Sequence, residues 1–315
     1  MVSVAHASDG GGSIRIPAAW CGIVGLKPSR GRVSARAIEV NRAGVDFVVA
    51  GTVRDVAGML DAVHGNEPGD LYLVPPPVRP FAIEPQVDPG RLRIGFLSAH
   101  DGVEIHPECV AATESTARLL ATLGHNVEAA RPDALFRQPP ATNPGLPLVG
   151  FRYMVRELAR MLGRAVESDD MEPGFWSAAT APVPPVSAEE YVEHLERVQE
   201  WVVRVANWWA AGFDLLLTPT VCEPAVPIER IVTLSRDPTA LGTLALEHAA
   251  LTLPFNLTGQ PAISLPLHWT PAGHPVGVQL VAAMGREDLL LRVAAQLESV
   301  RPWHDRYQQL DPTLG

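Results

Sequence analysis

Alternating apolar and polar residues, and short apolar runs, recur along the chain between stretches in which apolar residues follow a helical spacing. The first kind of pattern indicates strands and the second amphipathic helices. Strands are predicted over residues 2–7, 92–97, from 127, 214–220, 263–267 and 277–281. Helices are predicted over residues 53–63, 107–123, 151–166, 187–209 and 287–298, with a short helix and turns between 14 and 26. The succession of strand, helix and strand predicts an α/β fold.

A proline-rich segment at residues 75–90 interrupts this pattern. Because proline extends neither a helix nor a strand ladder, a surface connector between two halves of the chain is predicted there. A length of 315 residues allows one large domain or two smaller ones. The hydrophobic fraction of 47% and the mean hydropathy of +0.09 indicate a folded protein.

Charge and cysteine content exclude several classes of function. The formal net charge of −10 argues against a nucleic-acid partner, which would require clustered positive charge. Cys21, Cys109 and Cys222 form no C-x-x-C pair, so neither a disulfide framework nor a zinc or other metal site is indicated. A cytoplasmic location fits these free thiols. The apolar runs are too short or too interrupted to cross a membrane.

The most informative stretch is the glycine run Gly10-Gly11-Gly12, which is followed by Ser13. Glycines let main-chain N–H groups close on a small anionic centre, so the run could set a hydroxyl nucleophile beside an oxyanion hole. A plain turn between strand and helix is the alternative. A phosphate cradle is disfavoured, because the G-x-x-x-x-G-K-[ST] spacing is missing. The stretch does not match G-x-S-x-G either.

Read at full length, the stretch resembles the amidase signature family, the Ser-cisSer-Lys amidohydrolases. The resemblance rests on Ser8-Asp9-Gly10-Gly11-Gly12-Ser13-Ile14-Arg15-Ile16-Pro17-Ala18, Cys21-Gly22, Gly25-Leu26-Lys27-Pro28 and Gly31. It continues in segments 50–57, 214–220, 256–266 and 277–280, and so covers nearly the whole chain.

The resemblance implies a single α/β domain over residues 1–315, with a mixed central sheet covered by helices. It also implies hydrolysis of a small-molecule carboxamide through an acyl-enzyme, without a cofactor. Carried over by position, Ser13 is the nucleophile, and the N–H groups of Gly10, Gly11, Gly12 and Ser13 form the oxyanion hole. Asp9 and Arg15 match positions that support the loop rather than carry protons.

One departure from the family pattern stands out. The family's base is a lysine that acts through a second serine in a Gly-Ser-Ser-Gly-Gly type of loop, and both precede the segment where this chain starts. Lys27 is the only lysine, but it lies in the Gly-x-Lys-Pro part of the signature. Ser3 and Ser8 match no relay position. The expectation is an N-terminally truncated amidase, aggregation-prone and with little or no activity alone, whose complement is encoded separately or upstream of Met1.

A non-catalytic remnant or binding module that keeps the amidase core is the alternative. Other polar candidates are weaker, because the histidines show no metal-ligand spacing. Trp201, Trp208 and Trp209 are expected in the core, and Cys21 is expected to be a small buried thiol. The sequence does not identify the amide substrate, and it leaves a homo-oligomer open.

Overall fold

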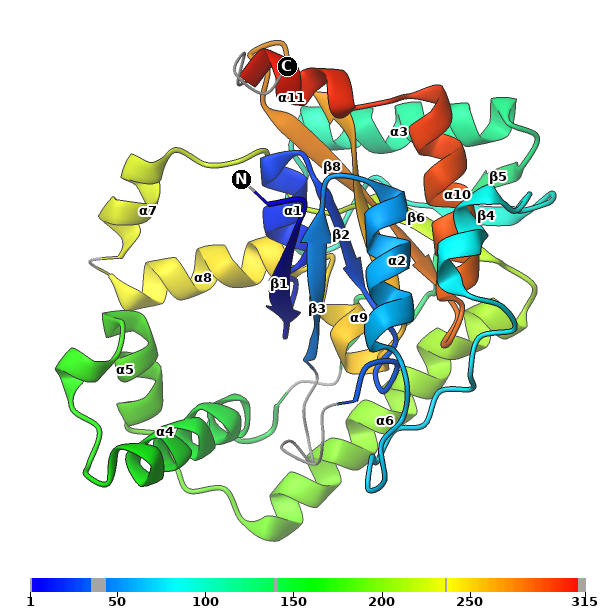
Figure 1. The fold of residues 1–315 in the computed structure, drawn as a ribbon. Helices are drawn as coiled ribbons and strands as arrows, with labels where there is room; N and C mark the ends of the chain where they lie inside the picture. The colour runs from blue at the N-terminus through cyan, green and yellow to red at the C-terminus, as the bar shows by residue number, and fades with distance from the viewer. Residues whose placement is uncertain (1, 35–43, 139–140, 236, 311–315) are drawn as a thin grey trace. The chain divides into compact units, whose positions relative to one another are not determined.

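The computed structural model describes residues 2–34, 44–138, 141–235 and 237–310, leaving aside the side chains of 238, 239 and 308–310 (Figure 1). Contacts divide the chain into two compact units. Unit 1 comprises Met1–Phe136, Val205–Ala225 and His248–Gly315, and unit 2 comprises Arg137–Arg204 and Val226–Glu247. The glycine run lies in unit 1.

Unit 1 is built on an eight-stranded sheet with the order β1-β3-β2-β7-β8-β6-β4-β5. Strand β4 is parallel to β5 and β6, and the other neighbours are antiparallel, so the predicted α/β fold with a mixed sheet is confirmed. The strands are β1 (Val4–Asp9), β2 (Val24–Lys27), β3 (Val45–Ala50), β4 (Arg93–Phe96), β5 (Asn126–Ala129), β6 (Leu215–Pro219), β7 (Ala262–Trp269) and β8 (Pro275–Ala282).

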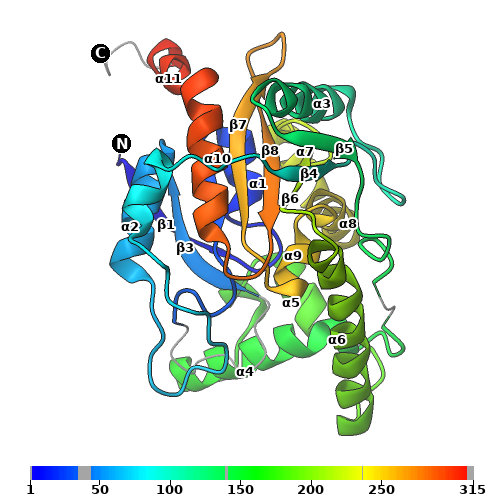
Figure 2. The same ribbon diagram turned by 90° about the vertical axis from the view of Figure 1, so that its right-hand side faces the viewer.

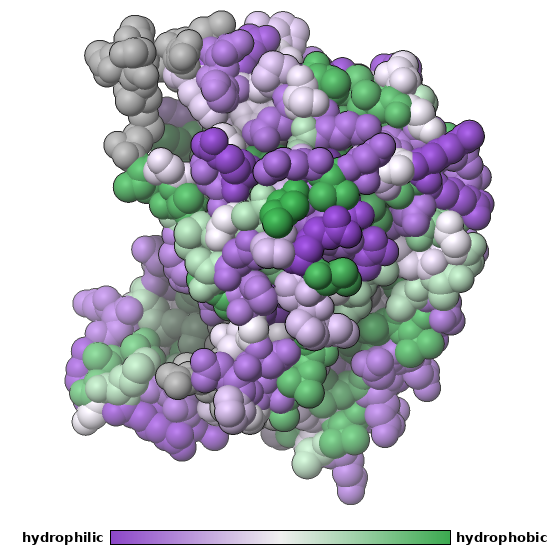
Figure 3. Space-filling model, turned by 45° about the vertical axis from the view of Figure 1, so that its right-hand side comes forward, coloured by the Kyte–Doolittle hydropathy of each residue, from purple (hydrophilic) through white to green (hydrophobic). Residues whose placement is uncertain are grey.

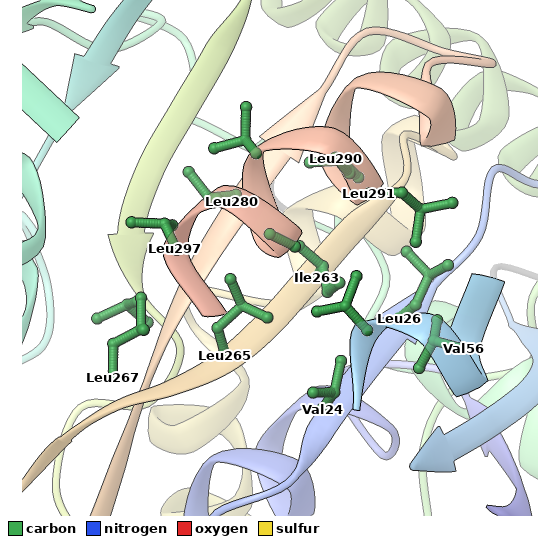
Figure 4. Packing of buried hydrophobic residues seen from close by; sticks show 14 of the residues in the cluster. Val24, Leu26, Val56, Ile263, Leu265, Leu267, Leu280, Leu290, Leu291 and Leu297 are labelled. Atoms are coloured by element: carbon green, nitrogen blue, oxygen red, sulfur yellow. The ribbon is translucent and has the colours of Figure 1, made fainter. Parts of the chain in front are cut away.

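Helices cover both faces of the central strands. In Figure 2, α10 lies in front of β7 and β8, and α1 lies behind them. The core between α10 and the sheet consists of aliphatic side chains, among them Leu290, Leu291, Leu297, Ile263, Leu265 and Leu280 (Figure 4). The helices of unit 1 are α1 (Arg15–Cys21), α2 (Val53–Val63), α3 (Pro107–Thr122), α9 (Leu253–Thr258), α10 (Glu287–Val300) and α11 (His304–Leu310).

Two strands were not predicted. Strand β2 lies where turns were expected, and all of its residues are buried between β3 and β7. Gly25 permits this placement, because a Cβ there would lie 2.6 Å from Ala18 Cβ of α1. Strand β3 joins β2 to β1, with Asp9 opposite Val45. Strand β1 leads directly into the glycine run.

The proline-rich segment 75–90 lies within unit 1. It contains a 3₁₀ helix, η1 (Phe81–Gln86), which buries Phe81 and Glu84. The Asp61 carboxylate of α2 accepts bonds from the N–H groups of Phe81 (2.6 Å) and Ala82 (2.8 Å). The segment is therefore partly a packed element.

Unit 2 is helical. Its elements are η2 (Leu146–Leu148), α4 (Val149–Leu162), η3 (Ser168–Asp170), α5 (Pro173–Thr180), the first part of α6 (Ala188–Ala210), α7 (Ile228–Leu234) and most of α8 (Pro238–Ala249). The capping box predicted at the start of α6 is present, because Glu190 N–H donates to Ser187 Oγ and Ser187 N–H to Glu190 Oε2.

Polar and apolar side chains are interspersed on the face shown in Figure 3. Among the described residues, no helix is long and apolar enough to cross a bilayer.

Candidate active site

The glycine run forms the turn between β1 and α1. Asp9 is the last residue of β1, and the helix begins at Arg15. The N–H group of Ile16 donates to the carbonyl of Gly12 at 2.7 Å, which closes the turn into the helix. Ser13 lies two residues ahead of α1 and is exposed, while Gly12 and Ile14 on either side are buried. The turn therefore presents the Ser13 hydroxyl to solvent between two buried residues.

The Asp9 carboxylate holds this turn from inside. It accepts hydrogen bonds from the N–H groups of Gly12 at 2.6 Å and Ile14 at 3.4 Å. Arg15 donates to it from Nε at 2.9 Å and from Nη2 at 3.0 Å. Burial alone would raise the pKa of Asp9, but the Arg15 guanidinium and hydrogen bonds from Arg15 and Asn256 hold this pKa well below its usual value.

The Arg15 guanidinium is fully buried and links the turn to distant segments. Its Nη1 donates to the carbonyl of Thr252 at 3.0 Å and to Gln279 Oε1 at 2.8 Å. Its Nη2 also donates to Asn256 Oδ1 at 2.6 Å. Gln279 in turn donates to Thr218 Oγ1 at 3.0 Å. Every charge and amide in this network has a partner, as a buried polar cluster requires.

Gly12 occupies a position that only glycine tolerates. Its φ is +137°, and a Cβ there would lie 2.4 Å from Thr252 Oγ1 and 2.5 Å from Ile16 Cδ1. Thr252 Oγ1 itself donates to the carbonyl of Gly11 at 2.6 Å. A Cβ at Gly10 would meet nothing within 4 Å. The third glycine is thus required by packing and conformation, whereas the first lines open space.

The predicted oxyanion donors differ in availability. The Gly12 N–H is already donated to Asp9. Within the described part of the chain, the N–H groups of Gly10, Gly11 and Ser13 have no acceptor. No described residue hydrogen-bonds to Ser13 Oγ either. The turn thus combines an exposed hydroxyl with unused main-chain donors, which is an arrangement suited to acyl transfer.

The chain is similar to known proteins over most of its length. The Amidase family model matches residues 1–291. The chain belongs to the amidase family. It is 40% identical over 324 residues to a 6-aminohexanoate-cyclic-dimer hydrolase of Pseudomonas sp. (strain NK87), and 39% identical to the protein of that name from Paenarthrobacter ureafaciens. Each alignment covers 98% of this chain but 65% of the relative, so the chain spans about 65% of its relatives' length.

Solved amidase structures show the same fold. The structure of a 6-aminohexanoate cyclic dimer hydrolase complexed with substrate superposes with a TM-score of 0.88 at 37% identity, covering 96% of this chain and 65% of that one. A bacterial aryl acylamidase of the amidase signature family gives a TM-score of 0.76 at 22% identity, which shows the fold alone; 98% of this chain and 64% of that one are covered.

None of the other candidates among the described residues hydrogen-bonds to Ser13 Oγ. Lys27 is fully buried, and its Nζ donates to the carbonyl of Pro28 at 2.9 Å. Two histidines meet carboxylates, His248 with Glu223 and His268 with Glu108, but no group of metal ligands forms among the described residues. Trp201 and Trp209 are buried, as expected of core residues, whereas Trp208 is half-buried.

The expectation for Cys21 was wrong. This thiol is exposed, because Cys21 is the last residue of α1 and the chain turns away at Gly22 in the left-handed conformation. No role was predicted for the polar residues that bond to Arg15, which are Thr252, Asn256 and Gln279, or for Thr218, which accepts a bond from Gln279. The usable signal was the placement of Thr218 and Gln279 inside otherwise apolar strands, where a polar side chain needs a partner.

Proposed function

We propose that the chain carries the nucleophile and oxyanion-binding part of an amidase that cleaves a carboxamide through an acyl-Ser13 intermediate. The observation that supports this most directly is the exposed Ser13 hydroxyl beside the unused N–H groups of Gly10, Gly11 and Ser13. Asp9 and Arg15 are the supporting residues, since their ion pair fixes the turn.

In the proposed reaction, Ser13 Oγ attacks the carbonyl carbon of the amide while its proton passes to a base. The tetrahedral oxyanion accepts hydrogen bonds from the N–H groups of Gly10, Gly11 and Ser13. The Gly12 N–H, the fourth predicted donor, orients the turn through Asp9. The C–N bond then breaks as the amine takes up a proton, and water releases the acyl group. One such donor contributes about 100- to 1,000-fold to the rate.

The proton acceptor is the element that the described residues do not supply at Ser13. The Lys27 amine donates to the carbonyl of Pro28 and makes no hydrogen bond to Ser13 in the described part of the chain. We propose that the acceptor is the family's lysine, acting through a second serine, on a further portion of the enzyme that is encoded separately or in the same chain. The greater length of the relatives supports this. The missing acceptor equally favours the alternative, a non-catalytic protein that keeps the amidase core.

A cyclic amide is the substrate class that we propose. Two relatives at 40% and 39% identity are named hydrolases of 6-aminohexanoate cyclic dimer. When a cyclic amide acylates a serine, the leaving amine stays attached to the acyl group. The enzyme must then admit water before the amine attacks the ester and closes the ring again. Such a substrate needs a site that separates the freed amine from Ser13.

A fluorophosphonate probe tests the nucleophile. We expect the chain, supplemented with a polypeptide that carries the family's lysine and second serine, to be labelled at Ser13. Labelling should be lost in Ser13→Ala and kept in Ser8→Ala, which removes another exposed serine from the neighbouring strand. Labelling that survives Ser13→Ala would exclude the proposed nucleophile. Absent labelling in the supplemented wild type would favour the non-catalytic alternative.

A further inference from the structure

The single lysine of the chain lies beneath the nucleophile turn. Lys27 ends β2 and is fully buried. Side chains alternate along a strand, so Lys27 shares a face with Gly25, and the Cβ position of Gly25 touches Ala18 of α1. The lysine side chain therefore lies on the face of the sheet that α1 covers. This is the face from which Gln279 and Thr218 reach the Arg15 network.

Positive charge is already in excess around Lys27. The charged groups that act on it are Arg15 of α1, Asp9 of β1, Arg30 after β2 and Glu287 of α10. Asp9 is paired with Arg15 at 2.9 Å, and Glu287 with Arg32 at 2.9 Å. Arg30 donates to the main-chain carbonyls of Asn256 and Leu257.

Three guanidinium groups thus share this region with two carboxylates, and both carboxylates are paired. A protonated Lys27 would be a further cation in a buried place. Its Nζ has the carbonyl of Pro28 as a hydrogen-bond acceptor, which satisfies a neutral amine but does not balance a charge.

We propose that Lys27 is a positioning residue for the nucleophile turn, which holds a neutral amine in the native protein and competes with Arg15 for the Asp9 carboxylate when it becomes protonated. Any effect of Lys27 protonation on catalysis rests on the proposed function of Ser13. Burial, followed by repulsion from Arg15, lowers the pKa of Lys27 to about 7. Asp9 orients the N–H groups of Gly12 and Ile14, so protonation of Lys27 would disturb the turn around Ser13.

Because Lys27 is the only lysine, ¹³C-lysine labelling gives a single side-chain resonance. We expect its Cε shift to titrate with a midpoint near pH 7 in the folded chain, about three units below the value in the urea-unfolded chain. The amide resonance of Gly12, followed by ¹⁵N-glycine labelling, should shift with the same midpoint. In Lys27→Gln, which keeps a donor for Pro28, the Gly12 amide should no longer titrate in this range.

His6 lies three residues before Asp9 and is the nearest histidine along the chain, so His6→Gln serves as the control and should leave the Gly12 titration unchanged. A Cε midpoint above pH 10 in the folded protein would overturn the proposal, since it shows a charged amine. An unchanged Gly12 titration in Lys27→Gln would also overturn it. The measurements need no turnover, and the same titration in Ser13→Ala separates this proposal from the role of Ser13.

Discussion

Thr252 Oγ1 donates a hydrogen bond of 2.6 Å to the carbonyl of Gly11, across 241 residues of sequence. The bond joins the start of α9 to the turn that presents Ser13. The carbonyl of the same Thr252 accepts from Arg15, so this residue holds the turn at two points. The position of Ser13 therefore depends on a segment that is distant in the sequence.

Thr252→Val tests this connection. The valine keeps the shape of the side chain but leaves the Gly11 carbonyl without its donor, which costs about 1–3 kcal/mol. We expect at least a tenfold slower reaction of Ser13 with a fluorophosphonate, measured in the supplemented enzyme. The control is Thr258→Val on the same helix, because the buried Thr258 Oγ1 has no partner among the described residues. That change should leave the labelling rate unaltered.

Substitutions at Gly12 and Gly10 should differ strongly in their effect on stability. Gly12→Ala forces a Cβ into Thr252 Oγ1 at a φ of +137°, and we expect a loss of about 3 kcal/mol in the free energy of unfolding. Gly10→Ala points its methyl group into open space and should change stability by less than about 0.5 kcal/mol. Urea unfolding measures both. Equal losses would show that the turn is not packed as described.

The Asp9–Arg15 ion pair predicts that the pH dependence of stability is reversed when Arg15 is removed. In the wild type the pKa of Asp9 is depressed, so its stabilising effect is complete above the unfolded value of about 3.9 and is lost on further acidification. Arg15→Met leaves the buried Asp9 carboxylate without its ion pair, although the hydrogen bonds from Gly12, Ile14 and Asn256 remain, and we expect a cost of about 3–5 kcal/mol at neutral pH. Burial then raises the pKa of Asp9, so this variant should gain stability as the pH falls from 7 to 4.5.

Urea midpoints at these two pH values provide the check. The matched control is Arg164→Met, which breaks an exposed pair with Asp170 and should change the midpoints little. An Arg15→Met protein that is as stable as the wild type at pH 7 would contradict the account.

The lowered pKa of Lys27 predicts a second effect of pH on stability, at alkaline pH. The native amine has a pKa of about 7, while the unfolded lysine keeps its proton up to about pH 10.4. The unfolded state therefore binds more protons in this window, and the free energy of unfolding should rise by about 2 kcal/mol between pH 7 and 9. In Lys27→Gln this rise should disappear. The same slope in both proteins would assign the effect to another group.

The sequence predicted those parts of the fold that carry a local signal. Helix α6 has a capping box and a long apolar face, and β6 is a short apolar run that ends at a proline. Strand β2 was missed because Val-Gly-Leu-Lys has neither alternation nor a continuous apolar run. Its burial depends on the close approach of α1 at Gly25 and on a lysine that lies inside the protein.

For the site, the motif led to Asp9, Ser13 and Arg15, which lie within seven residues of one another. No pattern in the sequence pairs Arg15 with Thr252, Asn256 or Gln279, because these contacts form only when β8 and α9 fold back beneath the turn. The sequence also does not show which of the four predicted N–H donors is already bonded within the protein. The structure does, since Asp9 engages Gly12.

The most direct test of the central claim is the mass of the enzyme during reaction with a cyclic amide. The supplemented protein would be mixed with 6-aminohexanoate cyclic dimer, quenched in acid and analysed by intact-mass spectrometry and peptide mapping. Acylation by a cyclic amide expels no fragment, so the account predicts an increase equal to the whole substrate mass, located on Ser13 and missing in Ser13→Ala. An adduct on another residue, or turnover that persists in Ser13→Ala, would contradict it.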